Sequence, residues 1–213
     1  MNATLYAIRR TIYTPYSTGI AASLDADSWL DHMEIVMPHT IEPANSGRSK
    51  CRGCGQPISK GELRFGERLP NPFSDDSEMT LWFHIDCASL KRPESLAEVI
   101  DAEANDPVNQ LENIKTLRTT AKFGIEYHRT QRIDGVERAP SGRAHCRSCQ
   151  EMIGKDEWRI RLVFFEDGMF NAAGNIHLGC SEAYFETTDI MNRLRHFGGE
   201  LSDADITEIK EHL

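Results

Sequence analysis

The clearest hydrophobic pattern in this chain is an alternation of apolar and polar residues in two separate stretches. Residues 61–69, GELRFGERL, place Leu63, Phe65 and Leu69 on one side of a strand. Residues 156–165, DEWRIRLVFF, turn four apolar side chains to one side, namely Trp158, Ile160, Leu162 and Phe164. A period of two is typical of a half-buried β-strand. Both stretches are therefore predicted to be strands with one face in a core.

Helical patterns and chain breaks divide the rest of the sequence into elements. Proline after Asp106 marks a first helical turn, the pair Gly198-Gly199 ends a helix, and Ser202 with Asp205 forms a capping pair. The expected elements are, in order, a strand over 35–41, helices over 93–105 and 106–118, a hairpin over 123–133 with its turn at Asp134-Gly135, and helices over 184–197 and 202–213.

A nine-residue segment with two cysteines occurs twice in the chain. SGRSKCRGC at residues 46–54 returns as SGRAHCRSC at residues 141–149, an offset of 95 residues. After both copies an isoleucine, a lysine, a glutamate and an arginine recur at the same offset. Each copy then ends in a His-x-x-Cys segment, HIDC at 84–87 and HLGC at 177–180. Self-similarity of this kind indicates a tandem repeat of one structural unit.

The cysteines and histidines of each copy have the spacing of metal ligands. A Cys-x-x-Cys turn presents two sulfurs to one ion, and thiolate with imidazole is a ligand set that suits zinc. Four protein ligands leave no open position, so we expect two structural Zn²⁺ ions per chain. Buried free cysteines or transient redox pairs are the alternative interpretation. The predicted ligands are Cys51, Cys54, His84 and Cys87, and Cys146, Cys149, His177 and Cys180.

These patterns predict an α+β fold of two small zinc-stabilised modules, each a short antiparallel sheet with flanking helices. The first module is expected over 34–122 and the second over 123–213. Residues 1–33 are interpreted as an N-terminal extension that packs on the first module. A chain of 213 residues is long enough for two domains of this size.

The net charge of −9 argues against a generic nucleic-acid binder, because phosphate contacts need Lys and Arg. The acidity lies mostly outside the repeats: residues 42–92 carry +1, residues 137–187 carry −2 and the remainder carries −8. Any DNA contact must therefore come from a local basic face.

The chain carries no apolar run of about 18 residues that would span a membrane. Its first residues also lack the apolar core of a signal peptide. We therefore expect an intracellular protein without membrane contact, located in the nucleus if the source is eukaryotic and in the cytoplasm or nucleoid if it is bacterial. The sequence leaves the oligomeric state open, and a monomer is the favoured interpretation.

The repeated segment resembles a known family once its surroundings are included. The SGR lead-in, the Cys-x-x-Cys knuckle, the arginine-bearing strand, a long loop and the final His-x-x-Cys resemble the zinc finger of poly(ADP-ribose) polymerases and of DNA ligase III. The resemblance covers about residues 40–90 and 137–183. The first copy has an aromatic pair, Trp82-Phe83, before its histidine, whereas Asn175-Ile176 in the second copy lacks the aromatic rings.

The resemblance implies recognition of DNA strand breaks. In that family the SGR arginine and the strand arginine contact the sugar–phosphate backbone, and an apolar pair on the long loop stacks on the exposed base. Stacking of this kind contributes about 1–3 kcal/mol per base without reading sequence. The residues implied are Arg48, Arg64 and Phe73 in the first module, and Arg143, Arg159, Met169 and Phe170 in the second.

Each of these residues also has a simpler structural interpretation. Arg48 and Arg143 could bond to carbonyl groups within the knuckle, and Met169-Phe170 could be a small core under its loop. Acidic residues near the first loop (Asp75, Asp76 and Glu78) would repel phosphate.

The sequence therefore predicts a non-catalytic, zinc-dependent DNA-binding protein that recognises nicks or ends by their structure. A DNA repair enzyme acting in trans is a candidate partner. The alternative function is a zinc-stabilised protein-interaction or regulatory module that has lost DNA binding.

Overall fold

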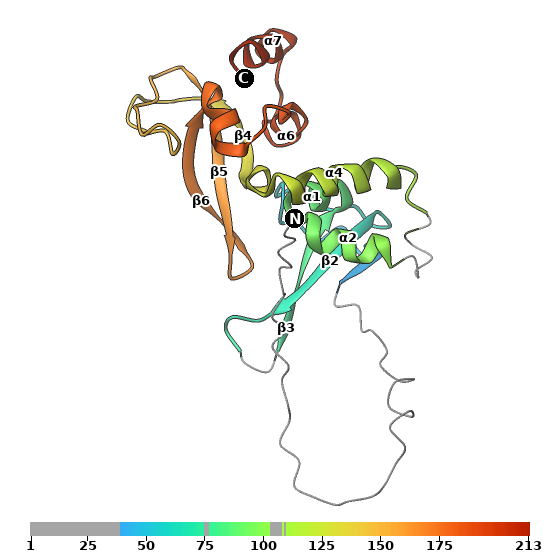
Figure 1. The fold of residues 1–213 in the computed structure, drawn as a ribbon. Helices are drawn as coiled ribbons and strands as arrows, with labels where there is room; N and C mark the ends of the chain where they lie inside the picture. The colour runs from blue at the N-terminus through green and yellow to red at the C-terminus, as the bar shows by residue number, and fades with distance from the viewer. Residues whose placement is uncertain (1–38, 75–76, 103–107, 109) are drawn as a thin grey trace, which may run out of the picture. The chain divides into compact units, whose positions relative to one another are not determined.

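The structure, a computed structural model, describes residues 39–74, 77–102, 108 and 110–213. It contains two three-stranded antiparallel sheets with helices beside each of them (Figure 1). The predicted α+β fold with two small modules is confirmed. The expected N-terminal extension, residues 1–33, and most of the expected strand over 35–41 lie outside the described residues.

The first sheet has the strand order β1-β2-β3, and its helices follow β3 directly. Its core is built from Ile58, Phe65, Phe83 and Leu96, all fully buried. Helices α1, α2 and α4 pack against one another beside this sheet (Figure 1). The elements are β1 (Thr40–Pro43), β2 (Leu63–Pro70), β3 (Glu78–His84), α1 (Ile85–Lys91), α2 (Pro93–Asp101) and α4 (Ile114–Glu126).

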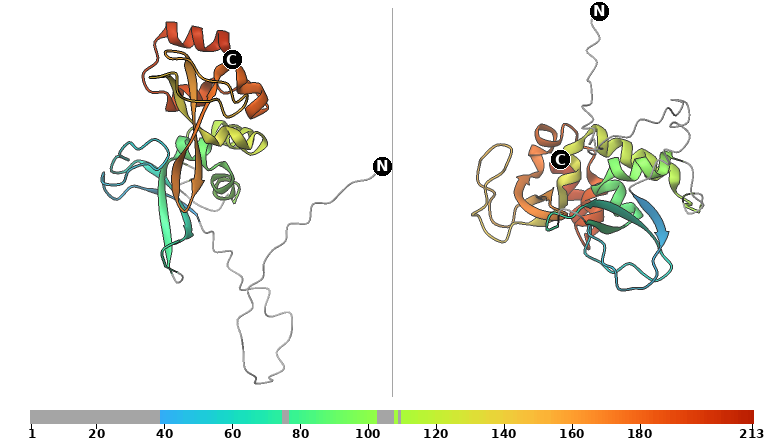
Figure 2. Two further views of the ribbon diagram at one scale, coloured as in Figure 1. Left: turned by 90° about the vertical axis from the view of Figure 1, so that its left-hand side faces the viewer. Right: turned by 90° about the horizontal axis from the view of Figure 1, so that it is seen from below.

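The second sheet repeats this plan with the strand order β4-β5-β6, and its core contains Ile153, Ile160, Ile176 and Leu194. Figure 2 shows this module from two further sides. The elements are η2 (His128–Arg132), β4 (Ile133–Arg138), β5 (Trp158–Glu166), β6 (Met169–His177), η3 (Leu178–Cys180), α5 (Ser181–Phe185), α6 (Met191–Phe197) and α7 (Asp203–His212).

The predicted strand over 61–69 is confirmed, but its two faces are less distinct than the alternation indicates. Arg64 and Glu67 are buried together with the apolar residues of β2. Glu67 accepts hydrogen bonds from the Arg92 guanidinium at 2.7–2.9 Å and from the Ser95 hydroxyl at 2.6 Å. Arg64 lies on the polar phase of β2 and Glu67 on the phase of Leu63, Phe65 and Leu69, and both are buried because they have partners on neighbouring elements.

The prediction that Phe164 turns inward is wrong, because Phe164 is 39% exposed whereas Val163 is buried. Ile160 and Leu162 belong to the core of the second module, and Phe164 lies farther along β5, beyond that core. The register between β5 and β6 shifts at the same place: Leu162 pairs with Gly174 and Val163 with Ala172, so Ala173 of β6 is an extra residue in the ladder.

The predicted hairpin over 123–133 is also wrong. Its first residues belong to α4, which runs to Glu126, and η2 follows. Asp134-Gly135, expected to be its turn, lies inside β4, where the pairing is irregular and Gly135 has a φ of 119°. The glycine therefore serves a bulge rather than a turn.

Two predicted helices begin or end at other residues than expected. The helix expected over 106–118 begins at Ile114, and residues 103–107 lie outside the described part of the chain. The helix expected over 184–197 is divided into α5 and α6, because Glu186 adopts the left-handed conformation with a φ of 64° and ends α5. The expected capping box of Ser202 and Asp205 is confirmed at the start of α7.

The boundary expected after residue 122 falls inside α4, and that helix packs against α1 and α2. Among the described residues, no helix is long and apolar enough to cross a membrane.

Candidate metal centres and nucleic-acid interface

The first metal centre joins the knuckle to the end of the sheet. The Arg52 N–H donates to the Trp82 carbonyl at 2.8 Å, which holds the knuckle against β3. Cys51 and Cys54 thereby approach His84 and Cys87, and all four ligand atoms lie within 4.8 Å of one another.

The ligand spacing of this first cluster suits a tetrahedral zinc site. The His84 Nδ1 atom lies 3.4 Å from the Cys54 sulfur and 3.8 Å from the Cys87 sulfur. Zinc bonds of about 2.0–2.3 Å in a tetrahedron place neighbouring ligand atoms about 3.6 Å apart. The His84 Nε2 atom is 3.3 Å from the Pro57 carbonyl and can donate to it, which leaves Nδ1 free to bind the metal.

The second metal centre has the same construction 95 residues later. The Arg147 N–H donates to the Asn175 carbonyl at 2.8 Å, as Arg52 does in the first module. The His177 Nδ1 atom lies 3.5 Å from the Cys149 sulfur, and its Nε2 atom lies 3.2 Å from the Met152 carbonyl. Cys146, Cys149, His177 and Cys180 form this cluster.

The acidities of the thiols indicate that each cluster needs a cation to ionise fully. A side-chain hydrogen bond with Cys87 lowers the pKa of Cys51 to about 5, and the same contact together with burial raises the pKa of Cys87. In the second cluster, burial raises the pKa of Cys180 to about 12. Three crowded thiols lose their protons together when a bound cation offsets their charge. The two Cys3His clusters therefore fit two structural zinc ions.

The arginine of the first SGR segment lies beside a basic groove. Arg48, Lys50 and Arg52 are exposed and line a groove of about 490 Å³ with Thr80 and Trp82 of β3. None of the three cations forms an ion pair with another residue in the part of the chain that the structure describes. A charged ligand can therefore reach them without breaking an internal contact.

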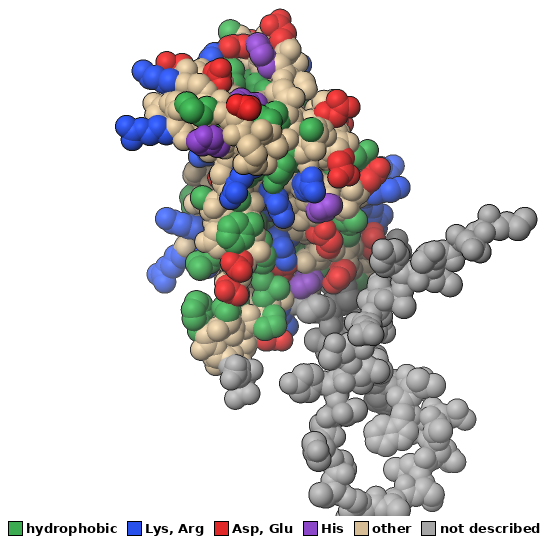
Figure 3. All heavy atoms as spheres, turned by 60° about the vertical axis from the view of Figure 1, so that its left-hand side comes forward, with side chains coloured by type: hydrophobic (Ala, Val, Ile, Leu, Met, Phe, Trp, Pro, Cys, Tyr) green, Lys and Arg blue, Asp and Glu red, His purple; other side chains and the backbone are tan. Residues whose placement is uncertain are grey.

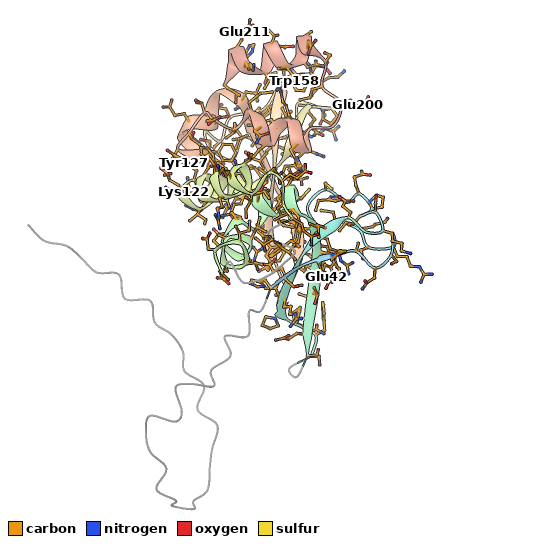
Figure 4. The ribbon with its side chains drawn as sticks, turned by 90° about the vertical axis from the view of Figure 1, so that its right-hand side faces the viewer. Glu42, Lys122, Tyr127, Trp158, Glu200 and Glu211 are labelled. Atoms are coloured by element: carbon orange, nitrogen blue, oxygen red, sulfur yellow. The ribbon has the colours of Figure 1, made fainter. Side chains whose placement is uncertain are left out.

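The strand arginine of the first module has internal partners instead. Arg64 is 6% exposed, and its guanidinium donates to Glu42 Oε1 at 2.6 Å and to Ser49 Oγ at 2.7 Å. Its guanidinium carbon also lies 3.5 Å from the centre of the Trp82 ring. Figure 4 labels Glu42, which lies on β1. Arg64 thus links β2 to β1 through Glu42 and to the segment before the knuckle through Ser49.

Phe73 is the most exposed large apolar side chain among the described residues, at 84%. The loop before β3 presents it: the Asn71 side-chain oxygen accepts a bond from the Phe73 N–H at 3.0 Å, and the Asn71 carbonyl accepts one from the Ser74 N–H at 3.2 Å. Such an Asx turn fixes the backbone locally while the ring points away from it. The acidic residues Asp75 and Asp76 lie outside the described residues, and Glu78 is exposed.

The corresponding arginines of the second module differ in the same way. Arg143 is exposed and, within the described residues, has no ion-pair partner. Arg159 is bound to Glu137, with its Nε atom 3.0 Å from the carboxylate. The cross-strand pairs Glu42–Arg64 and Glu137–Arg159 occupy equivalent places in the two sheets.

The prediction that Met169 and Phe170 lie on a long loop is wrong. Asp167 and Gly168, with φ values of 50° and 75°, form a two-residue turn between β5 and β6. Positive φ at both positions is the geometry that an Asp-Gly hairpin turn favours. Met169 is 48% exposed, but Phe170 packs against Phe83 of the first module, with ring centres 6.4 Å apart.

Several residues that the sequence interpretation did not single out lie where the two modules contact each other. A Cβ atom on Gly168 would lie 2.2 Å from the Met79 methyl group of β3, so the hairpin tip of the second module lies directly on the first. His196 of α6 and Lys91 of α1 also lie at this junction. No local spacing distinguishes either residue, since their partners are 109 and 42 positions away.

Duplicated α+β modules with two Cys3His clusters define a tandem zinc-binding protein, and the comparisons identify the type of module. The family model described as "Poly(ADP-ribose) polymerase and DNA-Ligase Zn-finger region" matches residues 42–127. The predicted resemblance is thus confirmed for the first module, and the second Cys/His cluster is consistent with tandem fingers.

Known relatives match longer parts of the chain. Poly [ADP-ribose] polymerase of Drosophila melanogaster is 28% identical over 144 residues, which cover 63% of this chain and 14% of the relative. The Sarcophaga peregrina polymerase is 32% identical over 147 residues, covering 63% and 15%. Polynucleotide 3′-phosphatase ZDP of Arabidopsis thaliana is 26% identical over 231 aligned residues, covering 98% and 32%. This chain therefore spans about a seventh of the two polymerases and about a third of the phosphatase.

Proposed function

We propose that this chain binds DNA strand breaks, and that its first module makes the main contacts. The observation that carries the proposal is the basic groove of Arg48, Lys50 and Arg52, whose cations have no acidic partner in the described structure, on the module that also exposes Phe73. On the face drawn in Figure 3, Lys and Arg side chains cluster near the centre of the molecule, with hydrophobic side chains next to them. A chain of net charge −9 can thus still present a local basic surface.

The chemistry of the two features suits a break rather than continuous duplex. Arginine and lysine bind phosphates without reading the sequence. The faces of bases are hidden in a continuous helix, but a nick or an end exposes one, and an aromatic side chain can stack on it. Phe73 is the side chain of the first module with the exposure that this contact needs. Recognition would then depend on the structure of the DNA and not on its base sequence.

The comparisons support this proposal. The matched family is named for poly(ADP-ribose) polymerase and DNA ligase, and one relative is named a polynucleotide 3′-phosphatase. We propose that the two modules themselves are non-catalytic, because four protein ligands close each tetrahedron and leave no position for substrate. A DNA repair enzyme acting in trans would then carry out the chemistry at the bound break.

The second candidate function is a zinc-stabilised protein-interaction or regulatory module. The pairing of Arg64 with Glu42 and of Arg159 with Glu137 favours it, because both strand arginines are already neutralised by acids. Phosphate would have to compete with these carboxylates. Binding through the groove residues, which have no such partners, does not meet this obstacle.

Two alanine variants test the proposal on a labelled nicked duplex. We expect Phe73→Ala to weaken binding about 5- to 150-fold, which corresponds to a stacking contribution of about 1–3 kcal/mol. Phe170→Ala serves as the matched control, because that ring already packs against Phe83. Fluorescence anisotropy on zinc-loaded protein measures both dissociation constants. If Phe73→Ala binds as tightly as the wild type, the stacking contact does not exist.

A further inference from the structure

A histidine of the second module lies against a metal ligand of the first. The His196 Nε2 atom on α6 is 3.1 Å from the Cys87 sulfur on α1, across 109 positions of sequence. Cys87 also lies 3.8 Å from the His84 Nδ1 atom within its own cluster. His196 is not part of the four-residue cluster, so it approaches the ligand from outside. An N–H donor in this place can bond to a thiolate that also binds zinc.

One turn after Cys87, the same short helix contacts the second module through Lys91. Lys91 follows Cys87 by four positions, which places both side chains on one face of α1. Its Nζ atom donates to the Ile133 carbonyl at 2.6 Å and lies 3.5 Å from Asp134. The Nζ atom lies 4.5 Å from the Phe197 ring centre and 5.2 Å from that of Phe170. Lys91 is 1% exposed, so its charge is compensated by the second module.

We propose that His196 is an outer-sphere residue of the first zinc site, and that α1 couples this site to the docking of the second module. Zinc fixes Cys87 and His84 at the start of α1. The Nε2–H group of His196 then donates to the Cys87 sulfur, and Lys91 at the end of the helix bonds to β4. Loss of the metal would release the start of α1 and both contacts with it.

The charges at the junction favour this arrangement. A zinc ion with three thiolates and one imidazole carries a net charge of about −1. The His196 Nε2 atom lies 3.1 Å from the Cys87 sulfur, and Lys91 adds a positive charge one turn later on α1. Outer-sphere donors of this kind orient the ligand and reduce its tendency to leave the metal.

The second zinc site provides an internal comparison. The Cys180 sulfur, the ligand equivalent to Cys87, lies 3.9 Å from the His177 Nδ1 atom inside its own cluster. Within the part of the chain that is described, no side chain of the first module approaches that sulfur as His196 approaches Cys87. The two sites should therefore respond differently to a change at residue 196.

The test replaces His196 in the intact chain and follows each metal separately. His196→Met removes the hydrogen-bond donor and keeps a flexible side chain, whereas His196→Gln keeps an N–H donor. The control variant is His128→Met, at another exposed histidine. With cadmium-113 in both sites, NMR correlations to the cysteine protons assign the two metal resonances. Zinc release to a chromophoric chelator gives one rate for each ion.

We expect His196→Met to shift the cadmium resonance of the first site alone and to speed the release of one zinc ion about 10-fold. This effect is at the low end for outer-sphere residues, because the ring is partly exposed. His196→Gln should restore most of both properties, and His128→Met should change neither. Unchanged resonances and rates in His196→Met would overturn the proposal. An equal response of both sites, or a failure of His196→Gln to restore the first, would also overturn it. None of these measurements involves DNA.

Discussion

Replacing Cys54 by serine should remove one of the two zinc ions and unfold the first module. Cys54 is half-buried, lies on the knuckle and supplies one of four ligands. Zinc in a site of this kind contributes about 10–16 kcal/mol of folding free energy in isolated fingers, which is as large as the total stability of about 5–15 kcal/mol of an ordinary domain. Elemental analysis should give one zinc per chain, and hydrogen exchange should become fast in β1, β2 and β3.

Cys149→Ser is the matched variant in the second module, because Cys149 is the equivalent ligand. It should also leave one zinc ion per chain, with fast exchange in β4, β5 and β6 and protection kept in the core around Phe65 and Phe83. Two zinc ions per chain in Cys54→Ser, with unchanged exchange in the first sheet, would contradict a structural role for this site.

Reversing the charge of the basic groove should abolish most DNA binding. Hydrogen bonds that involve a charged group contribute about 1.5–3 kcal/mol each, so Arg48→Glu with Lys50→Glu should weaken binding more than about 100-fold. The salt dependence should also become shallower by about two phosphate contacts. Zinc content and thermal stability should be unchanged, because both side chains are exposed and, within the described structure, without an ion-pair partner.

A matched control separates the groove from the general field of the protein. Lys115→Glu with Lys122→Glu changes the net charge by the same amount at two exposed positions on α4. This control should lose little affinity beyond the change in non-specific attraction. If it weakens binding as much as the groove variant does, the groove is not the contact surface.

The metal sites could be predicted from the sequence because their information is local. Cys-x-x-Cys and His-x-x-Cys each fit within one turn of chain, and the exact repetition of both pairs removed the ambiguity of a single motif. The two strands at 61–69 and 156–165 were predicted for the same reason, since alternation is visible within nine residues. The structure brings these local segments together as β2 and β5, each followed by a strand that ends at a ligand histidine.

Failures of prediction occurred where an element continues beyond the core or where one residue changes the direction of the chain. Phe164 lies past the core that holds Ile160 and Leu162, and the left-handed backbone at Glu186 divides a helix in two. Two Asp-Gly pairs were present, and the turn was assigned to Asp134-Gly135 when the true hairpin turn is Asp167-Gly168. The dipeptide favours a turn, but the surrounding strand pairing decides which copy forms one.

Contacts between modules could not be predicted at all. Phe170 was expected to be a loop residue free to stack on DNA, yet it packs on Phe83, and the sequence interpretation did not single out His196. Such contacts depend on how two folded units dock, and no periodicity in either unit encodes that arrangement. The acid partners of Arg64 and Arg159 depend likewise on strand register, which the sequence left open.

The most direct test of DNA-break binding compares one duplex with and without a nick. Both ligands have the same sequence, and the ligand without a nick is a closed dumbbell, which has no ends. Because both ligands carry nearly the same phosphates, the attraction of the protein's basic groups to phosphate is nearly equal for the two. Anisotropy titrations of the zinc-loaded chain at several salt concentrations give the two dissociation constants. We expect the nicked duplex to bind about 5- to 150-fold more tightly, from one stacked base at about 1–3 kcal/mol, with the ratio kept as salt increases. Equal or negligible binding of both ligands would contradict the proposed function.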